Sequence, residues 1–433
     1  MRDVLARVLG VAILGLAITS LASCGGSGSD LTATGSSASS SSSQVIAAPG
    51  ANAAAVVVDC GPAAICNTDY SAVNTLYVTV TVCQPGTSTC ATIDHVQVDT
   101  GSYGLRLLSQ ALPSGFSLPA EYSSTNNEAL AECTEFADGY SWGPLVLADV
   151  EVASETASSV PMQVIGDPNY TSVPSDCSGT GGSQEDTVMT FGANGILGVG
   201  PFAQDCGAAC AQEVVGSGYY QCLNATTCAS AQVTLAQQVT NPVVLFSSGD
   251  ANGVIVELPS IPAGGAASVT GTLVFGISTE NNNEITTQTI LPADPGSGDI
   301  TTTYNGTALT GSYIDSGSNG YFFADSSIPG CTVNTYFFCP SSTLDLSATV
   351  TGSDNNPSTT GATYTVDFSI ANADSLNGSY TAFDDLGGSL TSQQSAQSGG
   401  VFDWGLPFFF GRNVYTAIDG EATPVGEGPY FAY

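Results

Sequence analysis

Short runs in which apolar and polar residues alternate fill most of the chain from about residue 52 onward. The clearest run is Leu76 to Val82, which reads Leu-Tyr-Val-Thr-Val-Thr-Val, and Gly, Pro, Asn and Ser separate such runs from one another. A period of two places every second side chain on one face of an extended strand. The pattern therefore predicts a mainly β protein, with helices confined to short segments, the best of them at 208–215 and 235–239.

The N-terminal segment has a different pattern, with two arginines before an apolar stretch that is too short to span a bilayer stably. The stretch closes on Leu-Ala-Ser-Cys24, which resembles the bacterial lipoprotein box. Residues 1–23 are therefore predicted to be a signal peptide and Cys24 to carry a lipid, whereas an ordinary signal peptide with an incidental cysteine is the alternative. Residues 24–50, rich in Ser and Gly, would tether the protein to the bacterial cell envelope, at the outer membrane or its extracellular face.

Length, charge and histidine content narrow the range of possible functions. About 410 residues remain after the signal peptide, which favours two lobes over one core. The chain has 38 acidic residues against four arginines, and its formal net charge of −34 excludes nucleic acid as a partner. Only His95 is available as a histidine ligand, so neither a zinc site nor a Ser-His-Asp triad is predicted, and no cofactor is implied.

Cysteine usage fits an exported protein, because twelve cysteines remain once Cys24 is lipidated. Ten of them lie close to a neighbour in the sequence, which leaves one more distant pair. Other connectivities stay open at this stage. The favoured pairs are Cys60–Cys66, Cys83–Cys90, Cys206–Cys210, Cys222–Cys228 and Cys331–Cys339, with Cys133–Cys177 as the remainder.

One motif occurs twice: an apolar strand end, Asp, a hydroxyl residue, Gly and a second hydroxyl residue. The copies are Asp99-Thr100-Gly101-Ser102 and Asp315-Ser316-Gly317-Ser318. A glycine-containing apolar strand follows each copy, 97 positions on from Asp99 to Ile196 and 90 positions on from Asp315 to Gly405. The repeat predicts two duplicated β lobes, at 51–248 and 249–433, joined near 247–253.

The chemistry that suits such a repeat is acid–base catalysis by two carboxyl groups. If one must activate water while the other protonates a leaving group, the two must lie close together and share a proton. The glycines allow the backbones to approach, and the hydroxyls can hydrogen-bond to the carboxylates. A single Asp-Ser-Gly-Ser is equally well a surface turn capped by its aspartate. The duplicated context makes Asp99 and Asp315 the predicted catalytic pair.

Four blocks resemble the pepsin-type aspartic peptidases in order and spacing: the two Asp motifs and the stretches 194–200 and 412–419. The resemblance spans nearly all of residues 70–420 and implies an all-β, bilobal pepsin-like architecture with a cleft between the lobes. It also implies that Thr100 and Ser316 brace the two turns and that Ser102 and Ser318 steady the carboxylates. The chain, including its lipoprotein signal, resembles in addition a family of bacterial lipoproteins of unassigned function.

Several positions depart from the peptidase pattern. A hairpin flap that closes over the substrate is implied at 136–143, where Phe136 replaces the family's tyrosine and Tyr140 or Trp142 would have to substitute. Arg106 stands where the family has a tryptophan, and Pro407 where the second lobe has a glycine. Arg106 could act on Asp99 or on a substrate carboxylate, but an ion pair with a nearby surface acid is the favoured interpretation.

These observations favour a lipid-anchored, monomeric aspartic endopeptidase that acts on extended polypeptides outside the cytoplasm. The alternative keeps the two lobes but makes the cleft a binding groove for peptide or glycan without turnover. A third interpretation, a structural envelope protein on a disulfide-rich β scaffold, predicts no cleft.

Overall fold

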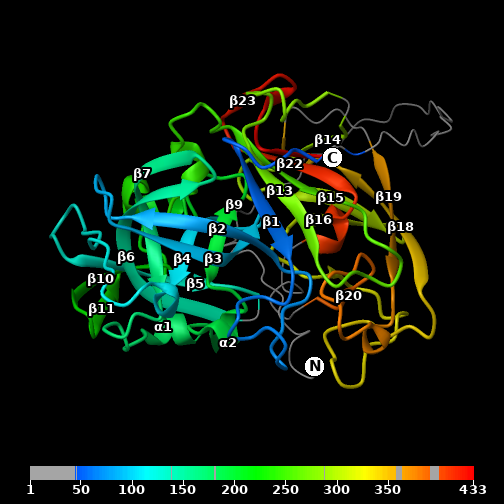
Figure 1. The fold of residues 1–433 in the computed structure, drawn as a ribbon, viewed down its shortest axis with the longest axis horizontal. Helices are drawn as coiled ribbons and strands as arrows, with labels where there is room; N and C mark the ends of the chain where they lie inside the picture. The colour runs from blue at the N-terminus through cyan, green and yellow to red at the C-terminus, as the bar shows by residue number, and fades with distance from the viewer. Residues whose placement is uncertain are drawn as a thin grey trace, which may run out of the picture.

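Two large sheets and one small two-stranded sheet, β23 with β24, contain the strands of this protein, as described by a computed structural model for residues 44, 46–137, 139–179, 182–286, 288–356, 363–390 and 399–433. One sheet has 16 strands in the described residues and runs from the first half of the chain into the second, and a sheet of 7 strands belongs to the second half. In Figure 1 the blue-to-green half lies on the left and the yellow-to-red half on the right, with β1 and β13 between them. The fold is therefore mainly β, as the alternating pattern predicts.

The first half contains β1 Ala53–Val58, β2 Leu76–Cys83, β3 Cys90–Asp99, β4 Tyr103–Leu108, η1 Ser109–Ala111, β5 Ala129–Glu135, β6 Gly139–Val152, β7 Glu155–Ile165, α1 Ser175–Ser178, β8 Ser183–Gln184, α2 Val188–Phe191, β9 Gly195–Val199, α3 Ala208–Gln212, β10 Tyr219–Asn224, β11 Thr227–Ser230, η2 Leu235–Gln237 and η3 Pro242–Leu245.

The second half contains β12 Gly253–Leu258, β13 Val269–Phe275, β14 Ile290–Pro292, β15 Ile300–Tyr304, β16 Thr307–Ile314, β17 Tyr321–Phe323, β18 Leu344–Thr351, β19 Tyr364–Ile370, η4 Ala373–Ser375, β20 Gly387–Gly388, β21 Phe402–Trp404, η5 Leu406–Phe409, β22 Arg412–Ala417, β23 Ala422–Thr423, β24 Gly426–Glu427 and β25 Tyr430–Ala432.

Both predicted helices exist only in reduced form. The segment at 208–215 forms α3 only as far as Gln212, because Glu213 already has an extended backbone with φ −145° and ψ 167°. The segment at 235–239 is the single 3₁₀ turn η2. The predicted strand at 76–82 is β2, in which the apolar side chains Val78, Val80 and Val82 are buried in the main core.

The two halves repeat one strand arrangement around the two aspartate motifs. In the first half, β9 runs parallel to β3 and antiparallel to β4. In the second half, β21 runs parallel to β16 and antiparallel to β17. The strands that the repeat predicted to follow each motif therefore insert between the two strands that flank it, which confirms the predicted duplication. Pairing of β1 with β13 joins the halves into one continuous sheet.

The end of the predicted tether is docked on the second half of the chain. Gln44 Nε2 donates to the Leu258 carbonyl at 2.6 Å, and the Ala47 N–H donates to Glu257 Oε2 at 2.6 Å. The folded part thus includes residues before the predicted lobe start at 51. The predicted signal peptide and Cys24 lie outside the described residues, and among those described no helix is long and apolar enough to cross a bilayer.

All six disulfides favoured by the cysteine spacing are present. Five close short loops of four to eight positions, whereas Cys133–Cys177 joins residues 44 positions apart and ties β5 to α1. Because a cross-link restricts the unfolded chain more when it closes a longer loop, Cys133–Cys177 is expected to stabilise the fold most, by about 4 kcal/mol.

Candidate active site

The two aspartates lie at equivalent places in the duplicated arrangement. Asp99 is the last residue of β3, opposite Gly198 of β9. Asp315 follows β16 directly, and its N–H donates to the carbonyl of Trp404 in β21 at 3.0 Å. Each aspartate therefore sits where a strand ends beside the inserted strand of its own half. Both side chains are buried, with 4% and 1% of their surface exposed.

Reciprocal hydrogen bonds lock the two turns to each other across the two halves. The Ser316 N–H donates to Thr100 Oγ1 at 3.0 Å, and the Thr100 N–H donates to Ser316 Oγ at 3.1 Å. Each hydroxyl in turn donates to a carbonyl of the opposite strand end, Thr100 to Ile314 and Ser316 to Val98. The arrangement satisfies two buried N–H groups and two hydroxyls at once, which fixes the relative position of the turns.

Each carboxyl group lies against the glycine of the opposite turn. The Gly101 N–H donates to Asp99 Oδ1 and the Gly317 N–H to Asp315 Oδ1, both at 2.7 Å. A Cβ added to Gly101 would lie 2.7 Å from Cγ of Asp315, and one added to Gly317 would lie 2.6 Å from Cγ of Asp99. Real Cβ atoms do not approach so closely, so only glycine allows the two carboxyl groups to face each other here.

The surroundings of Asp315 favour its protonated form. Burial is the main cause that raises the pKa of Asp315 well above its usual value, followed by the charges of Asp99 and Asp403 and a hydrogen bond with the Asp99 side chain. Two facing carboxyl groups in a buried site cannot both be ionised at low cost, so one proton is held between them. The pair can therefore provide an acid and a base at the same time.

The serines that follow the two glycines behave differently. Ser318 Oγ lies 2.9 Å from Asp315 Oδ2 and 2.7 Å from Oδ2 of Asp403, a buried aspartate of β21. Ser102 Oγ is buried and has no hydrogen-bond partner among the described residues. The expectation that both hydroxyls steady the carboxylates is thus met at Ser318, whereas the hydroxyl of Ser102 makes no such contact with Asp99 in the described structure.

Residues 48–433 match the family described as "Protein of unknown function (DUF3443)". The chain belongs to the DUF3443 family. Among solved structures, it is similar to the crystal structure of the aspartic proteinase from Irpex lacteus, with 15% identity, a TM-score of 0.47, and coverage of 88% of this chain and 96% of that one. No curated protein matches the sequence.

In this DUF3443 protein Arg106 is buried and paired with acids. Its guanidinium makes a two-pronged contact with Glu132 of β5, at 2.6 Å and 3.2 Å, and also contacts Asp205 at 2.9 Å. Tyr219 donates to the other oxygen of Asp205 at 2.5 Å. An acid is therefore the partner, but the expectation of a surface acid was wrong, because the main partner is Glu132, a buried residue of β5, which ends before the predicted flap begins.

Asp205 belongs to a network with more acid than base. Burial, then the adjacent charge of Glu132, raises the pKa of Asp205 well above its usual value. One arginine thus faces two carboxyl groups, and of the two Asp205 holds its proton to higher pH. The network links β4, which begins directly after the Asp99 turn, to the hairpin of β5 and β6.

The predicted flap residues lie in packed clusters. Phe136 is 3% exposed and meets Phe191 edge-to-face, with 5.8 Å between ring centroids. Tyr140 and Trp142 pack in a separate cluster with the Cys133–Cys177 disulfide, and Trp142 Nε1 donates to the Tyr170 carbonyl at 3.0 Å. The N–H of Trp142 is thereby engaged inside the fold. A substrate-binding role for these three side chains stays a prediction.

A narrow recess, with room for little more than one water molecule, opens beside the two turns. Burial raises the pKa of Asp299 in its wall to about 6. Apart from Thr100 and Gly101, this lining was not identified from the sequence, because its residues come from five separate segments. Its lining includes Thr100, Gly101, Tyr103, Asp299, Tyr313 and Phe431.

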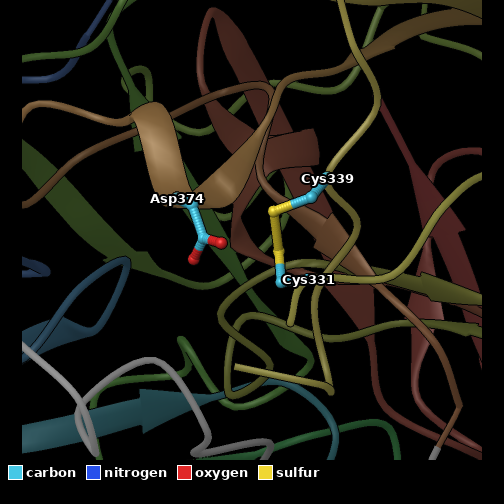
Figure 2. Close-up of side chains that lie close together, drawn as sticks. All are labelled: Cys331, Cys339 and Asp374. Atoms are coloured by element: carbon cyan, nitrogen blue, oxygen red, sulfur yellow. A yellow bond between two sulfur atoms is a disulfide. The ribbon is translucent and has the colours of Figure 1, made fainter. Parts of the chain in front are cut away.

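A group with the spacing of metal ligands occurs elsewhere, at Cys331, Cys339 and Asp374 (Figure 2). The two cysteines form a disulfide, as the figure shows, and a disulfide sulfur is not the thiolate that binds a metal. The group is therefore a covalent cross-link with an acid beside it.

Sequence reasoning missed several charged and polar residues of the site. Gln97, whose side chain donates to the Gly317 carbonyl at 2.9 Å, and the acids Glu132 and Asp205 have no local signal. Asp403 has one: it is the single charged residue in the apolar run 401–410, which reads Val-Phe-Asp-Trp-Gly-Leu-Pro-Phe-Phe-Phe. A lone acid in a strand that is otherwise apolar requires a buried partner.

Proposed function

We propose that this protein is an aspartic-type endopeptidase that hydrolyses extended polypeptides with water activated by Asp99 and Asp315. The observation that carries the proposal is the facing pair itself, held by matching glycine turns and by the reciprocal bonds of Thr100 and Ser316. Burial of such a pair serves no evident structural purpose, because two apolar side chains would cost less to bury. Perturbed carboxyl groups of this kind are typical of catalytic sites.

The roles follow from the proton that the pair shares. Asp315, whose pKa is raised, supplies the acid, and Asp99 supplies the base. Asp99 takes a proton from a water molecule as its oxygen attacks the peptide carbonyl, and Asp315 gives its proton to the oxygen that becomes negative. Collapse of the tetrahedral intermediate then breaks the C–N bond, with the leaving amine protonated from the pair.

Cleavage of a reduced and alkylated protein at pH 2 to 7 tests this proposal. Asp99→Asn and Asp315→Asn should each lower the rate by at least about a hundredfold, because each removes an acid–base group. Asp367→Asn is the matched control, since Asp367 is an exposed aspartate of β19. A statine-type transition-state mimic should block cleavage by the wild type. The proposal fails if no cleavage occurs at any pH, or if both site variants cut as fast as the control.

The second candidate is binding of a peptide or glycan without hydrolysis. It is favoured by the burial of the pair, since Asp99 and Asp315 expose only 4% and 1% of their surface. Calorimetric titration with unstructured peptides and with oligosaccharides would reveal it. Binding that is equally tight in the wild type and in Asp99→Asn, without any cleavage, would favour this candidate over the peptidase.

Export and anchoring at Cys24 form a separate part of the proposal. A strain that expresses the full chain should incorporate a labelled fatty acid into the wild type and not into Cys24→Ser. The variant should also move from the membrane fraction to the soluble fraction. Equal labelling of both proteins would contradict the anchor and leave the peptidase proposal untouched.

A further inference from the structure

A third carboxyl group is connected to the candidate pair by a hydrogen-bonded line that consists of Asp315, Ser318 and Asp403. Asp403 belongs to β21, and both Asp403 and Ser318 are 0% exposed. The Ser318 hydroxyl oxygen is 2.7 Å from Asp403 Oδ2 and 2.9 Å from Asp315 Oδ2, so one hydroxyl joins two acids at hydrogen-bond distance. At the equivalent place in the first half, opposite the residue two before the aspartate, β9 has Ile196.

The two contacts of Ser318 require a proton on one of the acids. A serine hydroxyl has a single hydrogen, so it can donate to only one carboxyl oxygen at a time. The other contact is a hydrogen bond only when the carboxyl group is itself protonated and donates to Ser318 Oγ. Two ionised carboxylates at these distances from one buried hydroxyl would leave an acceptor facing an acceptor, which is costly without water.

Other titratable groups around this line come from each neighbouring element. The negative charge of Asp99, in the first half, raises the pKa of Asp315. Besides burial, the charges of Asp99 and Asp315 raise the pKa of Tyr103 in β4. β16 and β17 flank Asp403 and place Tyr313 and Phe322 opposite it. Burial raises the pKa of Tyr321 in β17. The charge of Arg412 lowers that pKa, and the charges of Asp384 and Asp385 raise it. The described charges that act most strongly on Asp315 are therefore negative.

We propose that Asp403 is a positioning residue that shares a proton with Asp315 through the Ser318 hydroxyl. The role in hydrolysis rests on the proposed peptidase function, whereas the shared proton does not. In one arrangement Asp403 is protonated and donates to Ser318, and Ser318 donates to an ionised Asp315. In the other, the Asp403 proton has passed to Ser318 Oγ and the Ser318 proton to Asp315 Oδ2.

The transfer leaves the number of O–H bonds unchanged and moves one negative charge from Asp315 to Asp403. Asp315 can therefore regain a proton without exchange with bulk water after it has given one to the substrate. The same line keeps Asp315 protonated to higher pH than Asp99 alone would, because a negative charge on Asp403 opposes ionisation of Asp315. The third acid thus makes the two members of the pair unequal.

The direct test is a titration of aspartate carboxyl carbons by NMR in the folded protein labelled with ¹³C at the aspartate Cγ. Asp403→Asn and Asp403→Ile, the latter carrying the residue of the first half, each remove the third acid. In both variants we expect Asp315 to titrate lower by about one pH unit or more, because a buried like charge is lost. Asp367→Asn should leave the Asp315 titration unchanged.

Ser318→Ala keeps Asp403 but removes the connecting hydroxyl, so it separates a proton relay from simple repulsion. The relay predicts that the coupling between the Asp315 and Asp403 titrations becomes weaker in this variant, where only direct repulsion between the two charges remains. Thermal unfolding verifies that each variant is folded. An unchanged Asp315 titration in both Asp403 variants overturns the proposal, as does coupling in Ser318→Ala that is as strong as in the wild type.

Kinetics supply a second readout if the protein cleaves polypeptides. The alkaline limb of the pH–rate profile should move to lower pH in Asp403→Asn, with the rate on the acid side retained, and it should not move to lower pH in Ser318→Ala, because the Ser318 hydrogen bond lowers the pKa of Asp315. Loss of rate at all pH values without a shift would contradict the positioning role. Absence of cleavage by the wild type would end the peptidase proposal, and the NMR titration would still decide whether the proton is shared.

Discussion

The two aspartate turns are built from the same parts, yet they surround their carboxyl groups differently. Both turns have a glycine N–H on the inner carboxyl oxygen and a hydroxyl that bonds to the opposite turn. Around Asp315 a second hydroxyl and a third acid continue the hydrogen-bonded line. The corresponding strand position near Asp99 is the apolar Ile196. The repeated parts thus supply two facing carboxyl groups, and the differences between the halves give those groups different surroundings.

The cores behind the two turns also differ. Aliphatic side chains such as Val98, Leu105 and Leu197 pack behind the Asp99 turn. Rings pack behind the Asp315 turn, where Phe402 stacks on Trp404 with 4.2 Å between centroids. The buried ion pairs of Arg106 with Glu132 and Asp205 belong to the first half. The first half is therefore held partly by a buried ion pair, and the second by aromatic packing.

Arg106→Met should give the largest loss of stability, because it removes the buried ion pairs of the first half. It leaves Glu132 and Asp205 buried without their cation, which is expected to cost about 3–5 kcal/mol of the free energy of unfolding. Arg412→Met is the matched control, because Arg412 is only half-buried and lies over the Phe408 ring, and it should cost about 1 kcal/mol or less. Denaturant unfolding measures both. Equal costs would contradict the contrast between the halves.

Thr100→Val and Ser316→Ala test whether the two turns depend on each other equally. Each change removes the acceptor of one buried N–H in the opposite turn, so each should cost about 1–3 kcal/mol. The double variant should cost less than the sum, because the bonds form one network. Denaturant unfolding of the three variants provides the comparison. Strict additivity would show that the turns are independent.

Ser318→Ala and Ser102→Ala sharpen the difference between the halves. Ser318 is bonded to two acids, so its loss should cost about 1–2 kcal/mol near neutral pH. Ser102 has no hydrogen-bond partner among the described residues, so its loss should change the free energy of unfolding by only a few tenths of a kcal/mol. Thermal unfolding of the two variants side by side decides the point. A larger effect at Ser102 would reverse the assignment.

A decline of the free energy of unfolding with rising pH is a further expected effect. Burial raises the pKa of Glu257 from 4.5 to about 7 and that of Asp299 from 3.8 to about 6. Both groups bind protons more tightly in the folded chain, so their contribution is complete below pH 4 and is lost as the pH rises through 6 to 7. The melting temperature should therefore fall over this range.

Glu257→Gln should flatten the upper part of that decline, because the substituted amide does not titrate. Thermal unfolding of the wild type and of this variant at intervals between pH 4 and 8 measures the difference. Stability that rises with pH in the wild type would contradict the assignment of these two carboxyl groups.

The all-β class, the duplication and the facing turns could be predicted from the sequence because each leaves a local trace. Alternation marks β2, and the Asp-hydroxyl-Gly-hydroxyl pattern marks both turns. The partners of Arg106 could not be predicted, since Glu132 and Asp205 lie 26 and 99 positions away and meet only in the folded chain. The predicted length of the helix at 208–215 was wrong for a local reason, because the backbone is already extended at Glu213.

The most direct test of the account is the protonation state of Asp315 in the folded wild type, followed by NMR of its carboxyl carbon across pH 3 to 8. The account predicts that this group keeps its proton well above the ordinary aspartate value of 3.8, and that its titration moves to lower pH in Asp99→Asn. An Asp315 that ionises near 3.8 and does not respond to the change at Asp99 would contradict the claim that the two carboxyl groups share a proton.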